Sequence, residues 1–371
     1  MKKGFNFVLV FFTVFCFFSC HSFKVHSSYE EVRARNIPNL NGYITLLCDF
    51  HIHTVYSDGN VGPTVRVEEA YYENLDAIAI TDHVEHRIWR KYRSTSLNTS
   101  YEIAITSPRA NDVIVIRGSE ITRAMPPGHF NTIFLNNCDQ LAQEHYIDAF
   151  LAAKSQNAFF IWNHPGWRKQ LKDGAPFWWP EHTNLLERGM LHGIEVANGG
   201  SYFPAAHQWA LEHNLTMIGG TDVHKRLKNS SSRNYRTMTL VFARERTAQS
   251  IHEALMARRT AVYFKNRIIG EEKYLRELFE KSVKISVEKE NDNLLITFTN
   301  NSDFIFYFLS DENNPRLLYL NRFNFKMIPL LPNNAQFYTA KINENFNGEI
   351  NFTIDNLLVG PGTKMRYTLK I

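Results

Sequence analysis

Short apolar runs with the character of β-strands alternate with helix-like stretches between residues 44 and 224. Helical spacing is clearest in residues 63–75, which open with a proline, and in residues 202–214. This alternation is typical of successive βα units around a parallel sheet. The seven strand candidates are "ITLLCDFHIH", "LDAIAITDH", "DVIVIRGSEIT", "GHFNTIFL", "AFFIWNHP", "GIEVAN" and "TMIGGTDVH". Seven such runs predict a (β/α)7 barrel within residues 44–270.

The pattern changes after about residue 270. Six short β-branched and aromatic runs follow, separated by Asn, Pro and Gly: "SVKISVEKE", "NLLITFTN", "FIFYFLS", "QFYTAKI", "EINFTI" and "MRYTLKI". Short strands at this spacing predict a small antiparallel β-sandwich, of immunoglobulin-like type, over residues 271–371. This segment has no cluster of polar residues that would make a site, so we expect a packing or spacer module.

The first residues have the features of an export signal. Lys2 and Lys3 precede the apolar run "FNFVLVFFTVFCFF", which is too short for a typical spanning helix. The run ends in "FFSC", which resembles the cleavage box of bacterial lipoproteins and would make Cys20 the lipidated residue. We expect residues 1–20 to be a signal peptide and residues 21–43 a tether, in an exported protein anchored to the periplasmic or outer face of a membrane. A plain signal peptide or an uncleaved anchor is the alternative.

Charge and cysteine content exclude several classes of protein. The net charge of +4 is too small to favour nucleic acid as a partner. The densest basic stretch, residues 225–236, is interrupted by Ser and Asn and resembles a solvated loop. Cys48 lies within an apolar strand, which favours a buried free thiol over a disulfide framework.

Polar side chains stand at the ends of most of the expected strands. In a parallel barrel the carboxyl ends of all strands share one face, so these side chains should meet there. Each one alone could merely cap a helix, but together they would repel one another and resist burial unless cations bind. The residues are His51, His53, Asp58, Asp82, His83, Glu120, His129, His164, Asp222 and His224.

Six of these motifs, in this order, resemble those of the PHP (polymerase and histidinol phosphatase) family: "HIHTVYSDG", "AITDH", "GSE", "GHFN", "NHP" and "GTDVH". The resemblance implies a distorted seven-stranded barrel with a trinuclear metal centre. It assigns His51, His53, Glu120 and Asp222 to one metal. It assigns Glu120, His129 and His164 to the second, with Glu120 bridging, and Asp58, His83 and His224 to the third.

Such a centre predicts hydrolysis of small phosphate esters, either monoesters or diesters. Imidazole and carboxylate ligands without thiolates suit two to three divalent ions of zinc, manganese or iron. Clustered ions generate a hydroxide nucleophile and neutralise a phosphoryl group. Asp222 or His224 would carry a proton to the leaving group.

Substrate contacts are expected from loops that follow ligand-bearing strands. Arg123 and Arg168 are candidates for binding the phosphate, although solvated loop arginines are an equal alternative. Glu195 would support the ligands from outside the metal shell. Trp162, Trp167, Trp178 and Trp179 would form an apolar substrate wall or a small core of the loop itself.

Two other functions fit parts of the pattern. One is a non-catalytic, metal-binding surface module that docks glycans or proteins. The other is an amidohydrolase-like enzyme that cuts C–N or C–O bonds, because metal centres activate water for several electrophiles. Histidinol phosphatase itself is disfavoured, since export would separate the enzyme from cytoplasmic histidine synthesis.

Overall fold

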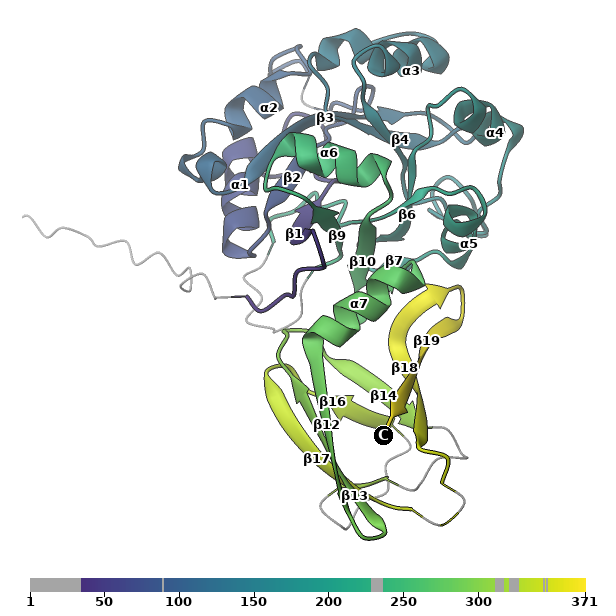
Figure 1. Cartoon of the computed structure of the whole chain (residues 1–371). Helices are drawn as coiled ribbons and strands as arrows, with labels where there is room; N and C mark the ends of the chain where they lie inside the picture. The colour runs from purple at the N-terminus through teal and green to yellow at the C-terminus, as the bar shows by residue number, and fades with distance from the viewer. Residues whose placement is uncertain are drawn as a thin grey trace, which may run out of the picture.

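The computed structural model describes residues 35–371 except residues 89, 228–235, 311–316, 320–326, 343 and 345. The proposed signal peptide, Cys20 and most of the tether lie outside the described residues. A larger α/β part and a smaller β part are joined at helix α7 (Glu272–Ser282) (Figure 1). Within the described part of the chain, no helix is both long and apolar enough to cross a bilayer.

All seven strands expected in the first part are present. They are β1 (Ile44–Asp49), β2 (Ala77–Ile80), β3 (Ile114–Thr122), β4 (His129–Ile133), β5 (Phe159–Trp162), β6 (Gly193–Asn198) and β8 (Thr216–Gly220). The first six pair in chain order, and β8 pairs with β6. β1 ends at Asp49, so His51 and His53 lie just beyond the strand and not within it.

The helices between the strands begin where the sequence has proline or polar caps. They are α1 (Pro63–Tyr72), α2 (Thr99–Ala104), α3 (Tyr146–Lys154), α4 (Pro180–Glu187), α5 (Pro204–Glu212) and α6 (Ala248–Met256). Pro63, Pro180 and Pro204 each occupy the first turn of a helix, where the missing backbone N–H costs nothing.

The sheet is mixed and not purely parallel, which corrects the expectation of uniform βα units. β4 runs antiparallel to both β3 and β5. Residues 123–128, which connect β3 to β4, are too few for the crossover that a parallel pair requires. Because β4 is reversed, its first residue, His129, lies at the carboxyl ends of its neighbours.

Three further strands extend this sheet. β9 (Met238–Ala243) is antiparallel to β1, and β10 (Thr260–Phe264) and β11 (Arg267–Gly270) follow it in the sheet. Side chains from β1, β2, β3, β4, β5, β8, β9 and α6 form one interior hydrophobic cluster. Between β8 and β9 the Thr239 hydroxyl accepts a hydrogen bond from Gly219 N at 3.0 Å and donates one to Gly219 O at 2.9 Å. No backbone ladder joins these two strands among the described residues, so a closed barrel stays a prediction.

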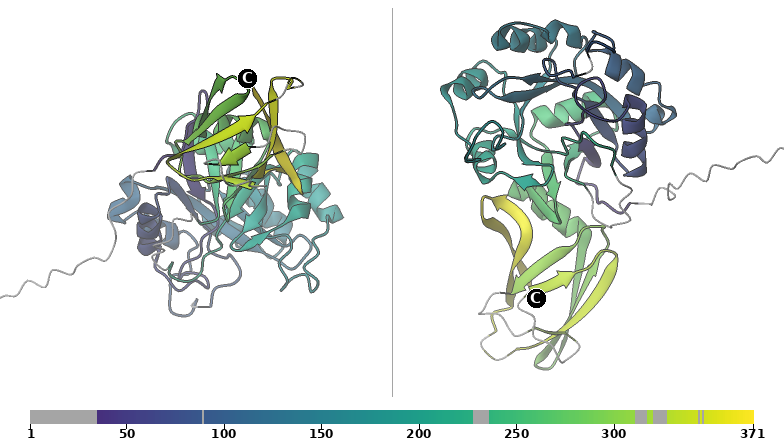
Figure 2. Two further views of the ribbon diagram at one scale, coloured as in Figure 1. Left: turned by 90° about the horizontal axis from the view of Figure 1, so that it is seen from below. Right: turned by 180° about the vertical axis from the view of Figure 1, so that it is seen from behind.

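The six strands expected in the second part are also present, with two more. The strands are β12 (Val283–Glu290), β13 (Asn293–Asn300), β14 (Phe306–Ser310), β15 (Leu317–Tyr319), β16 (Met327–Leu330), β17 (Asn334–Lys341), β18 (Glu349–Gly360) and β19 (Thr363–Lys370). One antiparallel sheet has the order β12-β13-β17-β15. The other strands join the large sheet, because β18 pairs in parallel with β11. The sheet therefore crosses the boundary expected at residue 270. Figure 2 shows the two parts from below and from behind.

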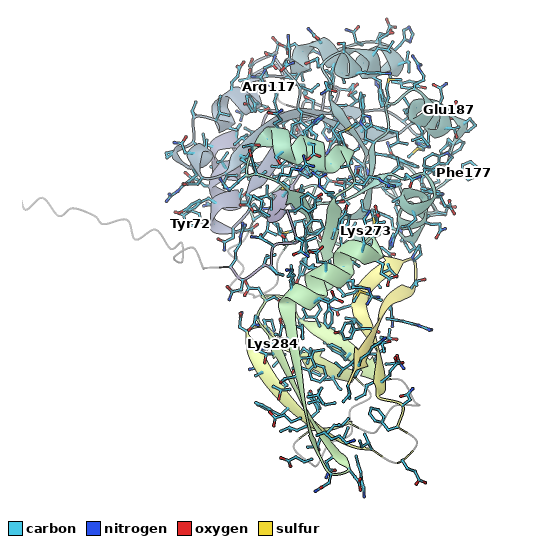
Figure 3. The ribbon with its side chains drawn as sticks, viewed as in Figure 1. Tyr72, Arg117, Phe177, Glu187, Lys273 and Lys284 are labelled. Atoms are coloured by element: carbon cyan, nitrogen blue, oxygen red, sulfur yellow. The ribbon has the colours of Figure 1, made fainter. Side chains whose placement is uncertain are left out.

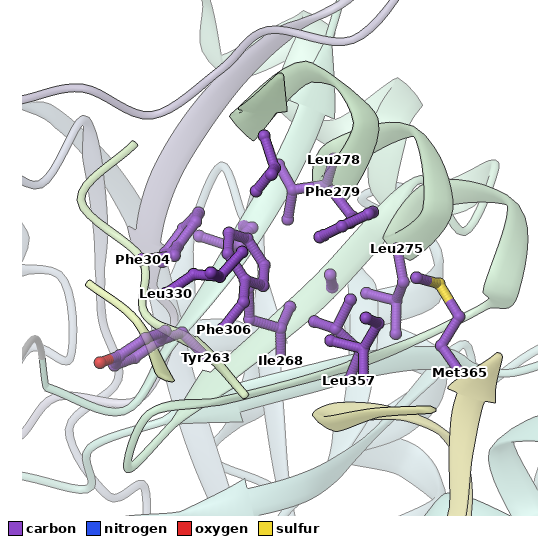
Figure 4. Packing of buried hydrophobic residues seen from close by; sticks show 14 of the residues in the cluster. Tyr263, Ile268, Leu275, Leu278, Phe279, Phe304, Phe306, Leu330, Leu357 and Met365 are labelled. Atoms are coloured by element: carbon purple, nitrogen blue, oxygen red, sulfur yellow. The ribbon is translucent and has the colours of Figure 1, made fainter. Parts of the chain in front are cut away.

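A continuous hydrophobic core fills the junction of the two parts. Leu275, Leu278 and Phe279 point from α7 toward Phe306 and Leu357 of the second part (Figure 4). The Phe279 ring lies 5.3 Å from Phe306 and 5.0 Å from Tyr367, both edge to face. Such aromatic contacts add to the stabilisation from burial alone.

Replacing Phe279 with Ala should lower the free energy of unfolding by about 3–5 kcal/mol, because it leaves a cavity in this core. All six tryptophans precede residue 210, so Trp fluorescence during urea unfolding reports on the first part alone. We expect the Trp transition to shift to lower urea together with the far-UV circular dichroism. A matched control is Phe337→Ala, which removes a ring that is 51% exposed and should cost about 0.5 kcal/mol or less. An unchanged Trp transition in Phe279→Ala would contradict coupling through the junction.

Candidate metal centre

The segments that follow β1 and β8 meet beyond the ends of these strands. Ile52 and Val223 form an isolated parallel bridge, and Asp222 N donates to His51 O at 2.9 Å. This pairing sets the side chains of His51 and His53 against that of Asp222. Residues 51 and 53 both point to the site, as the alternation of an extended chain requires.

The first group of candidate ligands is closely packed. His51 Nε2 and His53 Nε2 are 3.1 Å apart, and Asp222 Oδ1 lies 3.3 Å and 3.1 Å from them. Glu120 Oε2 lies 3.7 Å and 3.4 Å from the same two nitrogens. These four residues are the set that the sequence assigned to one metal.

Glu120, at 0% exposure, is the centre of the whole cluster. His129 Nδ1 lies 2.9 Å and His164 Nε2 lies 3.6 Å from Glu120 Oε1. His83 Nδ1 lies 2.8 Å from Glu120 Oε2, next to the first pair of histidines. One carboxylate thus contacts five imidazoles, and the second expected ligand set, Glu120, His129 and His164, is brought together around it.

A third group of candidate ligands surrounds the carboxylate of Asp58 at the outer side of the cluster. His224 Nε2 lies 3.2 Å and His83 Nε2 lies 3.5 Å from its carboxylate. His53 Nδ1 is 3.8 Å from the same carboxylate, so the His53 ring lies between the first and third groups. His86, which the sequence reasoning did not select, is 57% exposed and lies 3.9 Å from Asp58.

Neighbouring carboxylates and imidazoles offset the cost of burying charge at His83 and Glu120, but not at His53. Burial lowers the pKa of His83, but Glu120 and Asp58 outweigh this effect and raise it to about 10. Burial and the nearby charge of His83 lower the pKa of His53 to about 4. Burial raises the pKa of Glu120, but His83, His129, His164 and His51 hold it well below its usual range. Protons and divalent cations would therefore compete for the same atoms.

Buried polar groups hold the ligands in place from outside. Glu195, at 0% exposure, has Oε1 2.9 Å from His51 Nδ1 and accepts at Oε2 from the backbone N–H of His164 at 2.7 Å. Gly220 is required beside it, because a Cβ there would lie 2.6 Å from Glu195 Oε1. Asp82 accepts hydrogen bonds from Thr54 and Ser57 and so fixes the turn after His53.

The backbone is strained at two candidate ligands. His164 has a φ of 28° and Asp222 a φ of 54°, which non-glycine residues rarely adopt. Both residues are held there by the hydrogen bonds already described to Glu195 and His51. Strain of this kind is concentrated at functional sites.

Metal ions fit this set of residues. Glu120 Oε2 and His164 Nδ1 are buried without a hydrogen-bond partner. Four groups of His, Asp and Glu have ligand atoms within 4.8 Å of one another: His53, Asp58, His83 and His224; His51, His53 and Glu120; His51, His164 and Asp222; His83, Glu120 and His129. Imidazole nitrogens and carboxylate oxygens without sulfur are ligands that zinc, manganese and iron accept. The clusters can hold divalent ions, and they contain all nine of the expected ligands.

Arg123, which the sequence suggested for phosphate binding, contacts other residues of the protein. It forms an ion pair with Glu85 at 2.9 Å and donates to the carbonyls of Gln143 and Glu144. A phosphate contact by Arg123 stays a prediction. Arg168 is exposed in the loop after β5, so its charge is available.

The four tryptophans expected to form a substrate wall lie in three different surroundings. Trp162, at 0% exposure, stacks on His182 at 3.6 Å and on Trp209. Trp178 packs against Trp162, so both belong to a hydrophobic core that also includes residues of β4, β6 and α5. Trp167 lies 5.4 Å from the His129 ring and 5.1 Å from the His164 ring. Trp179 lines an open groove of about 860 Å³ with Phe177 and Glu187, which lie at the edge of the first part (Figure 3).

Sequence reasoning missed several polar residues that surround the ligands. Asn163 donates to Glu120 Oε1 at 3.0 Å, and Asp49 accepts from the backbone N–H groups of His51 and Thr221. Asn163 stands inside the quoted motif "NHP", and Asp49 stands in the quoted strand run "ITLLCDFHIH", so the place of each beside the ligands was a usable signal. Cys48 is a buried free thiol, as expected.

Comparison with known proteins finds an extensive match to a solved structure. A crystal structure of a two-domain protein from Bacteroides vulgatus, described as containing a predicted PHP-like metal-dependent phosphoesterase, has 43% sequence identity and a TM-score of 0.87. The match covers 92% of this chain and 99% of that one. No family model matches the chain.

Two other matches are much weaker. An uncharacterized protein of Methanocaldococcus jannaschii is 37% identical over 78 residues, which are 21% of this chain and about a third (34%) of that protein. A putative metal-dependent phosphoesterase from Bifidobacterium adolescentis has 16% identity over 57% of this chain and 96% of that one, with a TM-score of 0.38.

The two-domain relative matches nearly the full length of both chains, through the α/β part that carries the histidines and the β part attached to it. The chain belongs to the PHP-like family of this two-domain protein.

Proposed function

We propose that the chain is a metal-dependent hydrolase of small phosphate esters, with a trinuclear centre at one end of a distorted (β/α)7 barrel. The observation that supports this proposal most directly is the buried Glu120 carboxylate within 3.7 Å of five imidazoles. A carboxylate in this position suits a bridge between cations. The description of the Bacteroides vulgatus relative as a predicted phosphoesterase supports the same reaction class.

The ligand sets are those that the resemblance to the PHP family implies. His51, His53, Glu120 and Asp222 would hold one ion. Glu120, His129 and His164 would hold a second, and Asp58, His83 and His224 a third. Ions bound there would supply an activated water and would neutralise the charge of a phosphoryl group.

The protein's own residues would handle the proton and the substrate. His224 is 34% exposed and its Nδ1 lies 2.8 Å from Asp222 O, so it can reach a leaving group at the mouth of the site. Asp222 is the alternative proton carrier. Trp167 presents a ring beside His129 and His164, and Lys169 lies 5.3 Å above that ring. Together with Arg168, these residues would bind a compact anionic ester with a planar leaving group.

The purified protein should contain two to three divalent ions per chain by elemental analysis. His129→Ala and His164→Ala should each lower the metal content and reduce hydrolysis by about 100-fold or more, since even the outer partners of metal ligands are worth about 10- to 100-fold. His145→Ala, at an exposed histidine before α3, is the matched control and should change neither quantity. Less than one ion per wild-type chain after chelator-free purification would contradict the metal centre.

Substrate class is tested by steady-state rates on p-nitrophenyl phosphate, bis-p-nitrophenyl phosphate, nucleotides, single-stranded DNA, p-nitrophenyl acetate and an anilide. We expect turnover of the small phosphate esters, abolished by a chelator and restored by Mn²⁺ or Zn²⁺. DNA should be a poor substrate, because a polyanion needs a longer basic track than this chain has. Turnover restricted to the acetate or the anilide would instead indicate an amidohydrolase-like enzyme, and no turnover at all a binding module.

We also propose that the protein is exported and anchored through a lipid on Cys20. Cys20→Ser should move the protein from the membrane fraction to the soluble fraction of the native cell, because the lipid on Cys20 would be what holds the processed chain to the membrane. Hydrolysis by the released protein should be unchanged. Unaltered fractionation would favour a plain signal peptide or an uncleaved anchor.

A further inference from the structure

A buried arginine on α1 joins the two segments that carry most of the candidate ligands. Arg66 is only 1% exposed. Its Nε donates to His53 O at 3.0 Å, its Nη1 to Lys225 O at 3.0 Å, and its Nη2 to Val223 O at 3.2 Å. One guanidinium thus binds backbone carbonyls from both segments.

These two segments supply five of the nine candidate ligands. His51, His53 and Asp58 follow β1, and Asp222 and His224 follow β8. The carbonyls that Arg66 binds belong to His53 itself and to the residues on either side of His224. His53 N also donates to Val223 O at 3.1 Å, and Asn60 N to His224 O at 2.8 Å. The spacing between His53 and Asp222 therefore depends on this set of backbone contacts.

Glu69, one turn further along α1, completes the arrangement. Its Oε2 accepts from Arg66 Nη1 at 2.7 Å, and its Oε1 accepts from Leu227 N at 2.9 Å. Glu69 is 6% exposed, so the two charges are removed from water together. A buried ion pair is weak evidence for stability, because apolar side chains of similar size often do as well. A positional role accounts for the pair better than stability does.

We propose that Arg66 and Glu69 are a positioning pair that holds the His53 and Asp222 segments at the spacing needed for metal binding. The inference rests on the metal centre of the proposed function and extends it to residues that touch neither metal nor substrate. Arginine is suited to this task because its planar fork offers five donors in fixed directions.

The test is the dissociation constant for Mn²⁺, titrated as the only added ligand into the metal-free full-length protein. Removing a nearby positive charge should by itself tighten binding of a cation. Loss of positioning should instead weaken Mn²⁺ binding. We expect Arg66→Met to raise the Mn²⁺ dissociation constant by about 10- to 100-fold, as for other outer partners of metal ligands. The electron paramagnetic resonance spectrum of bound Mn²⁺ should also change.

A matched control is available in another buried arginine. Arg259, which lies between α6 and β10, is 6% exposed, donates to Phe242 O of β9 at 3.0 Å and pairs with Glu253 of α6. Arg259→Met should lower the unfolding midpoint as Arg66→Met does, but should leave the Mn²⁺ dissociation constant within about twofold. Arg66→Lys keeps the charge without the fork and should still weaken binding.

Wild-type Mn²⁺ affinity or tighter binding in Arg66→Met would overturn the positioning role while leaving the metal centre intact. Wild-type affinity in Arg66→Lys would overturn the role of the fork. If Arg66→Met does not fold, Arg66→Met/Glu69→Met removes both charges together and is expected to show the same loss of affinity. No Mn²⁺ binding by the wild-type chain would overturn the metal centre itself.

Discussion

The burial of Glu120 among five imidazoles is the constraint on which the rest of the site depends. A carboxylate at 0% exposure loses its hydration and must regain it from nearby donors or cations. Asn163 and the histidines provide part of this, yet Oε2 has no partner with hydrogen-bond geometry. Without cations, the negative charge of the carboxylates is neutralised only by protonated histidines, and burial disfavours the protonated form of a histidine. The arrangement is best explained as a set of ligands that is completed by metal ions.

This set of ligands requires two strands that are not neighbours to converge. β1 pairs with β2 and β9, whereas β8 pairs with β6. The segments beyond β1 and β8 nevertheless join through the bridge between Ile52 and Val223. Asp49 holds this junction from the strand side, because its carboxylate binds the backbone N–H groups of His51 and Thr221 and the side chain of Arg236. Arg66 holds it from α1, so buried charges occupy both sides of the contact.

The sequence was most informative where local pattern decides the structure. The seven first strands and the meeting of polar strand ends at one face follow from alternation and from the rule that strand ends share one face. The choice of nine ligands and their grouping came from the resemblance to the PHP family. The reversed direction of β4 follows from the short connection between β3 and β4, a signal that the sequence contains but that the alternation of strands and helices does not show. β9, β10 and β11 lie beyond the last recognised motif. The roles of Arg123 and Trp162 could not be read, because each depends on partners distant in sequence, such as Glu85 and His182.

The second part is bound more tightly than a spacer would be. The hydrophobic core that begins with Val67 and Ile78 of the first part continues without interruption to Phe306 and Phe352 of the second. β11 belongs to the sheet of the first part and also pairs with β18 of the second. β10 and β9 connect β11 to β1, the strand that leads directly to His51 and His53. A change at the junction is therefore expected to reach, through paired backbone, the strand that leads to two candidate metal ligands, and the second part would act as a structural support of that strand.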